Sequence, residues 1–193
     1  VKKNVYSNYS DKVLRIDDKK RFFLYPTFSR PFKKIEDFLK IAEFFSRLDF
    51  LSFDFYLTLT GKENNYSKWL FKKFGHLPNV VWLGKVDRAQ VFNLYEKSDC
   101  LVFTSHLETW GLPLTEFSLT NKTIIAPDLP YVHETLASYP KLALYDPNNV
   151  LRLLELCLRA ANGFFIEYAD TRARGSSGHS VDGWNNLLSL ITE

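Results

Sequence analysis

Six short apolar runs recur along the chain, and each is followed by polar or turn-forming residues. They are FFLY at 22–25, FDFYLTL at 53–59, VVWL at 80–83, CLVF at 100–103, TIIA at 123–126 and LALY at 142–145. Most of these runs are continuous rather than alternating, which is typical of parallel strands covered on both faces. The pattern therefore predicts a sheet of buried parallel strands.

Helical patterns lie between several of these runs. One apolar stripe with spacings of three and four predicts a helix over residues 35–48. Asp87 and Gln90 form a capping box that predicts a helix through Tyr95, and residues 149–161 also have a strongly helical pattern. Strands alternating with helices predict right-handed βαβ units, and hence an α/β fold with a Rossmann-like, doubly wound parallel sheet of about six strands.

The composition fits one well-buried domain. The chain has 193 residues, of which 46% are hydrophobic and 16% aromatic. We expect residues 1–20 to form a linker or N-terminal arm and residues 21–193 a single domain, with a mobile loop near 171–180 and a final helix over 181–192. The chain contains no Met, which suits a fragment of a longer protein.

Charge and cysteine content narrow the function classes. A net charge of +3 is too small to favour nucleic acid as a partner. No run of about 18 apolar residues predicts a membrane span, and the first residues lack the apolar core of a secretory signal. Cys100 and Cys157 have neither metal-ligand spacing nor a disulfide framework, which favours the reducing cytoplasm.

Two loops after predicted strands carry the candidate chemistry, because ligands of open α/β sheets bind beyond the carboxyl ends of the strands. The segment PTFSRPFKK at 26–34 contributes Arg30, Lys33 and Lys34. The segment HLETWGLPLTE at 106–116 places Glu108 and Glu116 on either side of a glycine and a proline.

The second loop reads as the start of a helix. Gly111 allows close backbone approach, and Pro113 suits the first helical turn. The free N–H groups of Gly111 and Leu112 would then bind an anion. Glu108 and Glu116 would repel that anion but could accept hydrogen bonds from hydroxyl groups, so the basic loop is the part that attracts it. The pattern therefore predicts a ligand with an anionic middle and hydroxyl-bearing ends, which is the shape of a nucleoside diphosphate sugar.

Other interpretations of these residues stay open. The two glutamates could be ordinary charges at a helix start, and the basic residues a solvated cluster. A glycosidase acid pair is disfavoured by the adjacent anion site. His106 is a packing or rim residue in preference to a base, and Trp110 could either fill the core or line a sugar pocket.

The stretch ETWGLPLTE at 108–116 resembles the Glu-x7-Glu signature of GT-B glycosyltransferases of the group 1 (family 4) type, which usually read EGFGLPxxE. The resemblance extends from about Phe22 to Tyr145. Further motifs occur in the family's order: the Arg-Lys loop, TLTG at 58–61, NVVWLGKV at 79–86, SDCLVFTSHLE at 98–108 and TIIAPDLPYVHE at 123–134.

The resemblance implies the C-terminal, donor-binding half of a retaining glycosyltransferase. It implies that Arg30 and Lys33 hold the diphosphate and take part in catalysis, with help from the backbone at Gly111 and Leu112. It also implies that Glu108 contacts the donor sugar, as a catalytic and donor-binding residue, and that Glu116 contacts the ribose.

The chain departs from the family's usual pattern at several positions. Thr109 and Trp110, which are also donor-binding candidates, replace the usual Gly and Phe and change the shape of the sugar pocket. Arg30 and Lys33 are closer together than is common, so Lys34 could share their role. Asn121 stands where Gly is usual at a helix end, which Asn tolerates.

The same resemblance sets the expected partners. We expect a nucleotide-sugar donor, linked to uridine or guanosine, and no metal or other cofactor. We expect a missing N-terminal acceptor-binding domain, with any membrane contact peripheral and made through that half. Surface polysaccharide or glycan biosynthesis is the expected setting, and the isolated fragment would bind donor without turnover. A GT-B-type sugar-nucleotide epimerase and a non-enzymatic sugar-nucleotide-binding module are the alternatives.

Overall fold

The computed structural model describes Ile16, residues 20–48 and residues 53–163. The expected loop at 171–180, the expected helix at 181–192 and most of the expected arm at 1–20 lie outside the described residues. Ile16, within that expected arm, is 7% exposed and packs into the hydrophobic core.

A six-stranded sheet organises the described residues, and all of its neighbouring strands pair in parallel. In the order in which they occur along the chain, the strands are β1 (Arg21–Tyr25), β2 (Phe53–Leu57), β3 (Val80–Trp82), β4 (Cys100–Val102), β5 (Thr123–Pro127) and β6 (Leu142–Tyr145). Their order across the sheet is β3-β2-β1-β4-β5-β6. The predicted Rossmann-like parallel sheet is thus confirmed, with several strands one or two residues shorter than the apolar runs.

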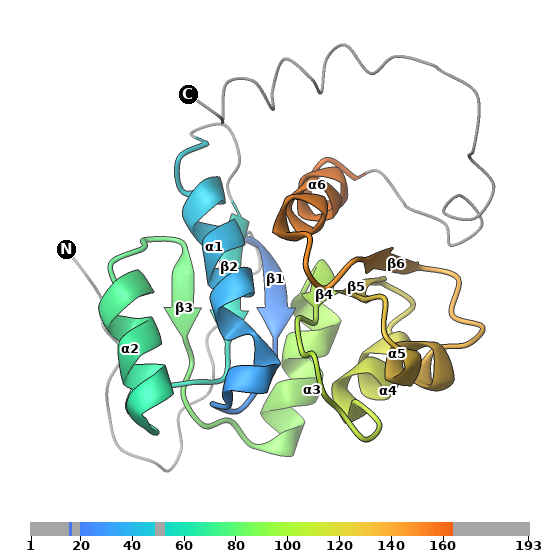
Figure 1. Ribbon diagram of the computed structural model, residues 1–193, viewed down its shortest axis with the longest axis horizontal. Coiled ribbons are helices and arrows are strands. Elements are labelled where there is room, and N and C mark those ends of the chain that lie inside the picture. The colour runs from blue at the N-terminus through green and yellow to red at the C-terminus, as the bar shows by residue number, and fades with distance from the viewer. Residues whose placement is uncertain (1–15, 17–19, 49–52, 164–193) are drawn as a thin grey trace.

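Helices connect the strands and cover the sheet (Figure 1). They are α1 (Ile35–Phe45), α2 (Asn65–Phe74), α3 (Arg88–Lys97), α4 (Leu112–Ser118), α5 (Pro130–Thr135) and α6 (Val150–Ala161). Helix α1 packs against both α2 and α6, whereas α4 packs against α5. A short 3-10 turn, Pro31–Lys33, precedes α1.

Local signals account for several helix ends. The side chain of Asp87 accepts from the backbone N–H of Gln90 at 2.8 Å, and the reciprocal bond is present, so the predicted capping box is confirmed. Asn64 and Ser67 form a second capping box at the start of α2, which sequence reasoning missed. Asn121 has a left-handed φ of 54° after α4, as expected of a residue standing in for Gly.

Aromatic side chains fill much of the core. All five residues of β2 are buried, and Phe23 packs against Phe45, Phe53 and Phe55 with ring centroids 4.9–5.7 Å apart. Aromatic burial of this kind contributes both apolar area and favourable ring geometry. The strands are therefore fixed in register by packing on both faces of the sheet.

The strand order creates one point where consecutive connections diverge. From β1 the chain proceeds outward to β2 and β3, and then it crosses back to form β4 on the other side of β1. The loops after β1 and β4 therefore meet beyond neighbouring strand ends, where open α/β sheets bind their ligands.

Among residues 20–48 and 53–163, no helix combines the length and apolar character needed to cross a membrane.

Candidate functional site

Direct hydrogen bonds join the loops that follow β1 and β4. The hydroxyl of Thr104 donates to the carbonyls of Lys33 and Lys34, at 2.9 Å in each case. The backbone N–H of His106 donates to the carbonyl of Phe32 at 2.8 Å. Thr104 is fully buried, so these bonds are shielded from water. The two predicted loops thus form one structural unit at the diverging strands.

The backbone of Lys33 is held from two sides. Besides the bond from Thr104, its carbonyl accepts a hydrogen bond from the hydroxyl of Tyr25 at 2.8 Å. Burial raises the pKa of Tyr25 well above its ordinary value, so the phenol remains a donor. Lys34 follows with a left-handed φ of 48° and begins α1. This fixed backbone aims the side chain of Lys33 toward the loop after β4.

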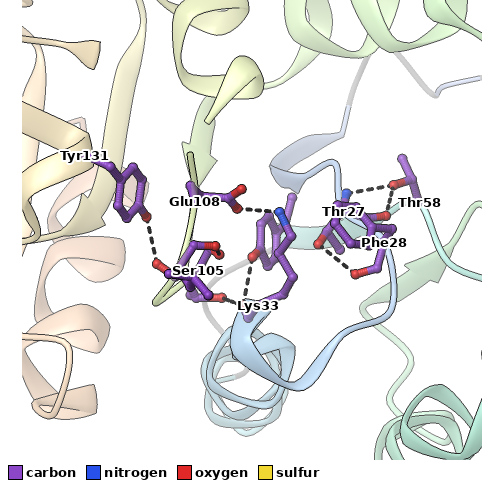
Figure 2. Close-up of polar contacts among 10 residues, drawn as sticks. Thr27, Phe28, Lys33, Thr58, Ser105, Glu108 and Tyr131 are labelled. Atoms are coloured by element: carbon purple, nitrogen blue, oxygen red, sulfur yellow. Dashed lines mark hydrogen bonds and ion pairs between the residues drawn. The ribbon is translucent and has the colours of Figure 1, made fainter. Parts of the chain in front are cut away.

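Lys33 and Glu108 form an ion pair between these loops (Figure 2). Their side chains are only 6% and 14% exposed. Lys33 Nζ also lies 4.3 Å from the ring centroid of Phe28, which gives the ammonium an aromatic neighbour. A charge this deeply buried requires a partner, because an unpaired buried ion is costly. Sequence reasoning expected both residues at one ligand but did not predict their direct contact.

The loop that carries Glu108 is anchored to α5. The hydroxyl of Tyr131 donates to the carbonyl of Ser105 at 2.7 Å, as Figure 2 shows, and the hydroxyl of Ser105 donates to the carbonyl of Leu107 at 3.1 Å. Burial raises the pKa of Tyr131, so its hydroxyl keeps its proton and continues to donate. Tyr131, which the sequence did not single out, therefore helps to set the approach of Glu108.

The helix start predicted after Glu108 is present. Gly111 is the N-cap of α4 with a left-handed φ of 78°, and Pro113 lies in the first turn. A Cβ at Gly111 would meet Leu114 Cδ1 at 3.1 Å, so both conformation and space favour glycine there. Leu112 is 63% exposed, which leaves this helix start facing outward.

Trp110 lies at the surface and is not part of the core. Its side chain is exposed, its indole N–H donates to the hydroxyl of Thr115 at 2.9 Å, and its carbonyl accepts a bond from Thr135. Thr109 is also exposed. The interpretation of Trp110 as core filler is therefore wrong, and its role in lining a sugar pocket stays a prediction.

Glu116 has partners on α3 and is not paired with Lys33. Its carboxylate accepts from the hydroxyl of Tyr95 at 3.1 Å and lies 3.1 Å from an Arg88 guanidinium nitrogen. Burial, followed by the charge of Glu116, raises the pKa of Tyr95. The neighbouring hollow of about 280 Å³ is lined by Phe92, Tyr95, Glu96, Glu116, Leu119, Thr120 and Lys122. Arg88 and Tyr95 are site neighbours that sequence reasoning missed.

Arg30 is not drawn into the Lys33–Glu108 pair. Its exposed guanidinium donates to the carbonyl of Ser29 at 2.9 Å and lies 5.7 Å from the ring centroid of Phe28. Ser29 is tied in turn to Asn64, whose amide donates to the Ser29 carbonyl at 2.9 Å. Arg30 and Lys33 thus share one aromatic neighbour, although only Lys33 contacts the carboxylate.

His106 is joined to the loop after β1 through its backbone N–H, which donates to the carbonyl of Phe32. Its ring Nε2 is buried and has no hydrogen-bond partner among the described residues. This geometry neither pairs the imidazole with Glu108 nor assigns it the role of a base.

Sequence and structure comparisons agree on the kind of protein that this chain resembles. The family model of the glycosyl transferases group 1 matches residues 8–163. No curated protein sequence matches the chain.

Three solved structures illustrate the likeness. TarM of S. aureus has a TM-score of 0.64 at 17% identity, over 82% of this chain and 31% of that one. A glycosyltransferase from Rickettsia africae ESF-5 has a TM-score of 0.61 at 20% identity, over 75% of this chain and 38% of that one. Sucrose-phosphate synthase from Thermosynechococcus elongatus has a TM-score of 0.61 at 15% identity, over 75% of this chain and 37% of that one. The likeness establishes the GT-B type of fold, and the matched part spans only about a third of each of these structures.

Proposed function

This chain belongs to the group 1 glycosyl transferases, and from that premise we propose that it is the donor-binding half of a retaining glycosyltransferase. Its ligand is a nucleoside diphosphate sugar. The sugar is transferred to an acceptor that binds elsewhere in the complete enzyme.

The contact between Lys33 and Glu108 carries this proposal. One cation and one carboxylate meet where the connections after β1 and β4 diverge, which is the usual ligand position in such sheets. A nucleoside diphosphate sugar needs this combination, because its diphosphate is anionic and its sugar offers neutral hydroxyl donors. A site for phosphate alone would gain nothing from a buried carboxylate.

Each remaining candidate has a role that its surroundings support. Lys33 binds the diphosphate, and the exposed Arg30 over the same Phe28 ring adds a second cation. The N–H groups at Gly111 and Leu112 assist at the helix start.

The two carboxylates and their exposed neighbours then bind the hydroxyl-bearing ends of the ligand, which are the donor sugar and the ribose. Glu108 accepts hydrogen bonds from the donor sugar, next to Thr109 and Trp110. Glu116, held near the surface by Arg88 and Tyr95, accepts from the ribose.

Catalysis in this proposal is electrostatic. When the bond between the anomeric carbon and the diphosphate breaks, negative charge develops on the departing phosphate oxygen. The ammonium of Lys33 and the guanidinium of Arg30 stabilise that charge, and a preorganised cation in a shielded site is effective at this task. The donor-binding residues of this chain therefore require no metal ion in our proposal.

We propose that the nucleoside of the donor is uridine or guanosine. A solved TarM complex contains UDP, which makes uridine the first base to test. Turnover requires the acceptor-binding half, since the matched part spans about a third of the compared structures. We place the reaction in polysaccharide or glycan biosynthesis in the cytoplasm, a compartment that suits the free, buried Cys100 and Cys157.

A ligand panel tests the proposal. Calorimetry of this chain with UDP, GDP and free hexoses should give clear binding of a nucleoside diphosphate and weak or no binding of a hexose. Binding of a bare hexose as tight as that of UDP and GDP would overturn the proposal.

A further inference from the structure

The ammonium proposed to bind the diphosphate already has an anionic partner. We propose that Glu108 is a specificity-determining residue, which favours nucleotide-sugars over bare nucleoside diphosphates by competing with the diphosphate for Lys33. This inference rests on the proposed function and adds to it a means of discriminating donor from product.

The competition follows from the surroundings of Lys33 Nζ. Among the described residues its only ion pair is with Glu108, and its other close neighbours are the aromatic rings of Phe28, Phe32 and Phe103. Aromatic rings attract the cation without neutralising it. A phosphate oxygen that approaches Lys33 must therefore displace Glu108 or stand beside it, and two anions at one cation repel each other.

Glu108 cannot respond by moving freely into water. Its side chain is largely buried, and its loop is tied down by the bond from Tyr131 to Ser105 and the bond from His106 to Phe32. A carboxylate that loses its buried cation needs another hydrogen-bond donor. The presence or absence of that donor distinguishes the two kinds of ligand.

A bare nucleoside diphosphate supplies only acceptor oxygens to this part of the site. A nucleotide-sugar also brings hydroxyl groups, which can donate to the carboxylate as Lys33 turns to the diphosphate. The sugar-bearing donor therefore satisfies both members of the pair, whereas the diphosphate product leaves Glu108 without a partner. After sugar transfer, re-formation of the Lys33–Glu108 pair favours release of the product.

Glu116 provides an internal contrast. Its carboxylate is already satisfied by Arg88 and by the hydroxyl of Tyr95, and it is not paired with Lys33. We therefore expect the carboxylate of Glu108, and not every carboxylate near the site, to discriminate between donor and product.

The test uses neutral and charged replacements of Glu108. Glu108→Gln keeps the size of the side chain and removes its charge, so UDP and GDP should bind roughly 10-fold tighter. UDP-glucose and GDP-mannose should gain less, because the carboxylate that accepts from their hydroxyls is gone. The preference for the nucleotide-sugar should therefore shrink by the ratio of the two gains. Glu108→Asp retains the negative charge and should give no such gain.

A matched control removes a carboxylate elsewhere. Glu134→Gln makes the same change in net charge at an exposed position on α5 and should leave all four affinities unchanged. Thermal unfolding of each unliganded variant verifies folding. Glu108→Ala is the second neutral variant, and it should also bind UDP and GDP more tightly.

The outcomes separate this inference from the proposed function. If the wild-type chain binds UDP or GDP and both neutral variants bind no tighter than Glu134→Gln, the competition is refuted while the donor-binding function stands. If no variant and no wild-type chain binds a nucleoside diphosphate, the proposed function fails and the inference fails with it. A gain in affinity confined to Glu108→Gln and Glu108→Ala supports the inference.

Discussion

Tyr25, at the end of β1, donates its phenolic hydrogen to the carbonyl of Lys33 at 2.8 Å. The bond joins the strand to the residue that we assign to the diphosphate, and Thr104 of the loop after β4 donates to the same carbonyl. Both donors are fully buried. The position of Lys33 is thus fixed by the sheet itself and not by the loop alone.

Tyr25 should also influence stability at alkaline pH. Burial raises its pKa in the folded protein above the unfolded value of 10.0. Its contribution is therefore fully present below pH 10 and decreases as pH rises above that value, because the unfolded chain then releases the phenolic proton first. Each such tyrosine lowers the free energy of unfolding by about 1.4 kcal/mol per pH unit in that range. The free energy of unfolding, measured by urea denaturation between pH 8 and 11, should fall less steeply with rising pH for Tyr25→Phe than for the wild-type chain. Equal slopes of the free energy of unfolding against pH would contradict this prediction.

Glu116→Gln should lower the affinity for uridine and the affinity for UDP by a similar factor, about 5- to 20-fold. The reason is that its proposed partner is the ribose, which both ligands contain. Calorimetry with the two ligands measures the effect, and Glu134→Gln, which removes an exposed carboxylate on α5, is the matched control. A loss confined to UDP would place Glu116 at the phosphates and not at the ribose.

Arg30→Ala should lower the affinity for UDP or GDP by roughly 10-fold at low salt, because one charge-assisted hydrogen bond is removed. Its side chain is exposed, so the difference from the wild-type chain should decrease as sodium chloride is raised. Arg47→Ala, in the turn that follows α1, removes another exposed guanidinium and serves as the control. If Arg30→Ala lowers the affinity for UDP or GDP no more than Arg47→Ala does, Arg30 is an ordinary solvated residue and does not bind the diphosphate.

EDTA should leave nucleotide affinity unchanged, since Lys33 and Arg30 supply the positive charge that the diphosphate requires. Titration of UDP and GDP with and without the chelator, after dialysis against each buffer, measures this. A loss of affinity of more than about tenfold in EDTA would show that a divalent ion takes part in donor binding.

The sequence predicted the sheet well because buried parallel strands leave a local signal. The run TIIA at 123–126 became β5, Asp87 capped α3 as expected, and Asn121 took the left-handed conformation of a helix end. Helix α5 was not predicted, because its six residues are too few to show helical periodicity. The start of α2 was missed because Ser67 replaces the usual Glu or Gln of a capping box.

The candidate site was predicted at the level of loops but not of contacts. Lys33 and Glu108 could be assigned to one ligand because both follow strands. Their ion pair depends on β4 lying next to β1, which the chain reaches only after two other strands. The hydrogen bond that Tyr95 donates to Glu116 and the ion pair of Arg88 with Glu116 likewise depend on α3 lying near α4. Side-chain partnerships of this kind have no local sequence signal.

In the proposed function, the ammonium of Lys33 binds the donor diphosphate. Lys33→Gln alone would leave Glu108 buried without its cation, so the double variant Lys33→Gln with Glu108→Gln is compared with Glu108→Gln. Both keep the carboxamide at position 108 and differ only at position 33. Lys68→Gln, an exposed lysine on α2, controls for the loss of one positive charge.

The decisive measurement is the dissociation constant of UDP or GDP for these chains, once thermal unfolding has shown that each is folded. We predict that the double variant binds at least about 10-fold more weakly than Glu108→Gln, while Lys68→Gln matches the wild-type chain. Equal affinity of the double variant and Glu108→Gln would contradict the assignment of Lys33 to the diphosphate.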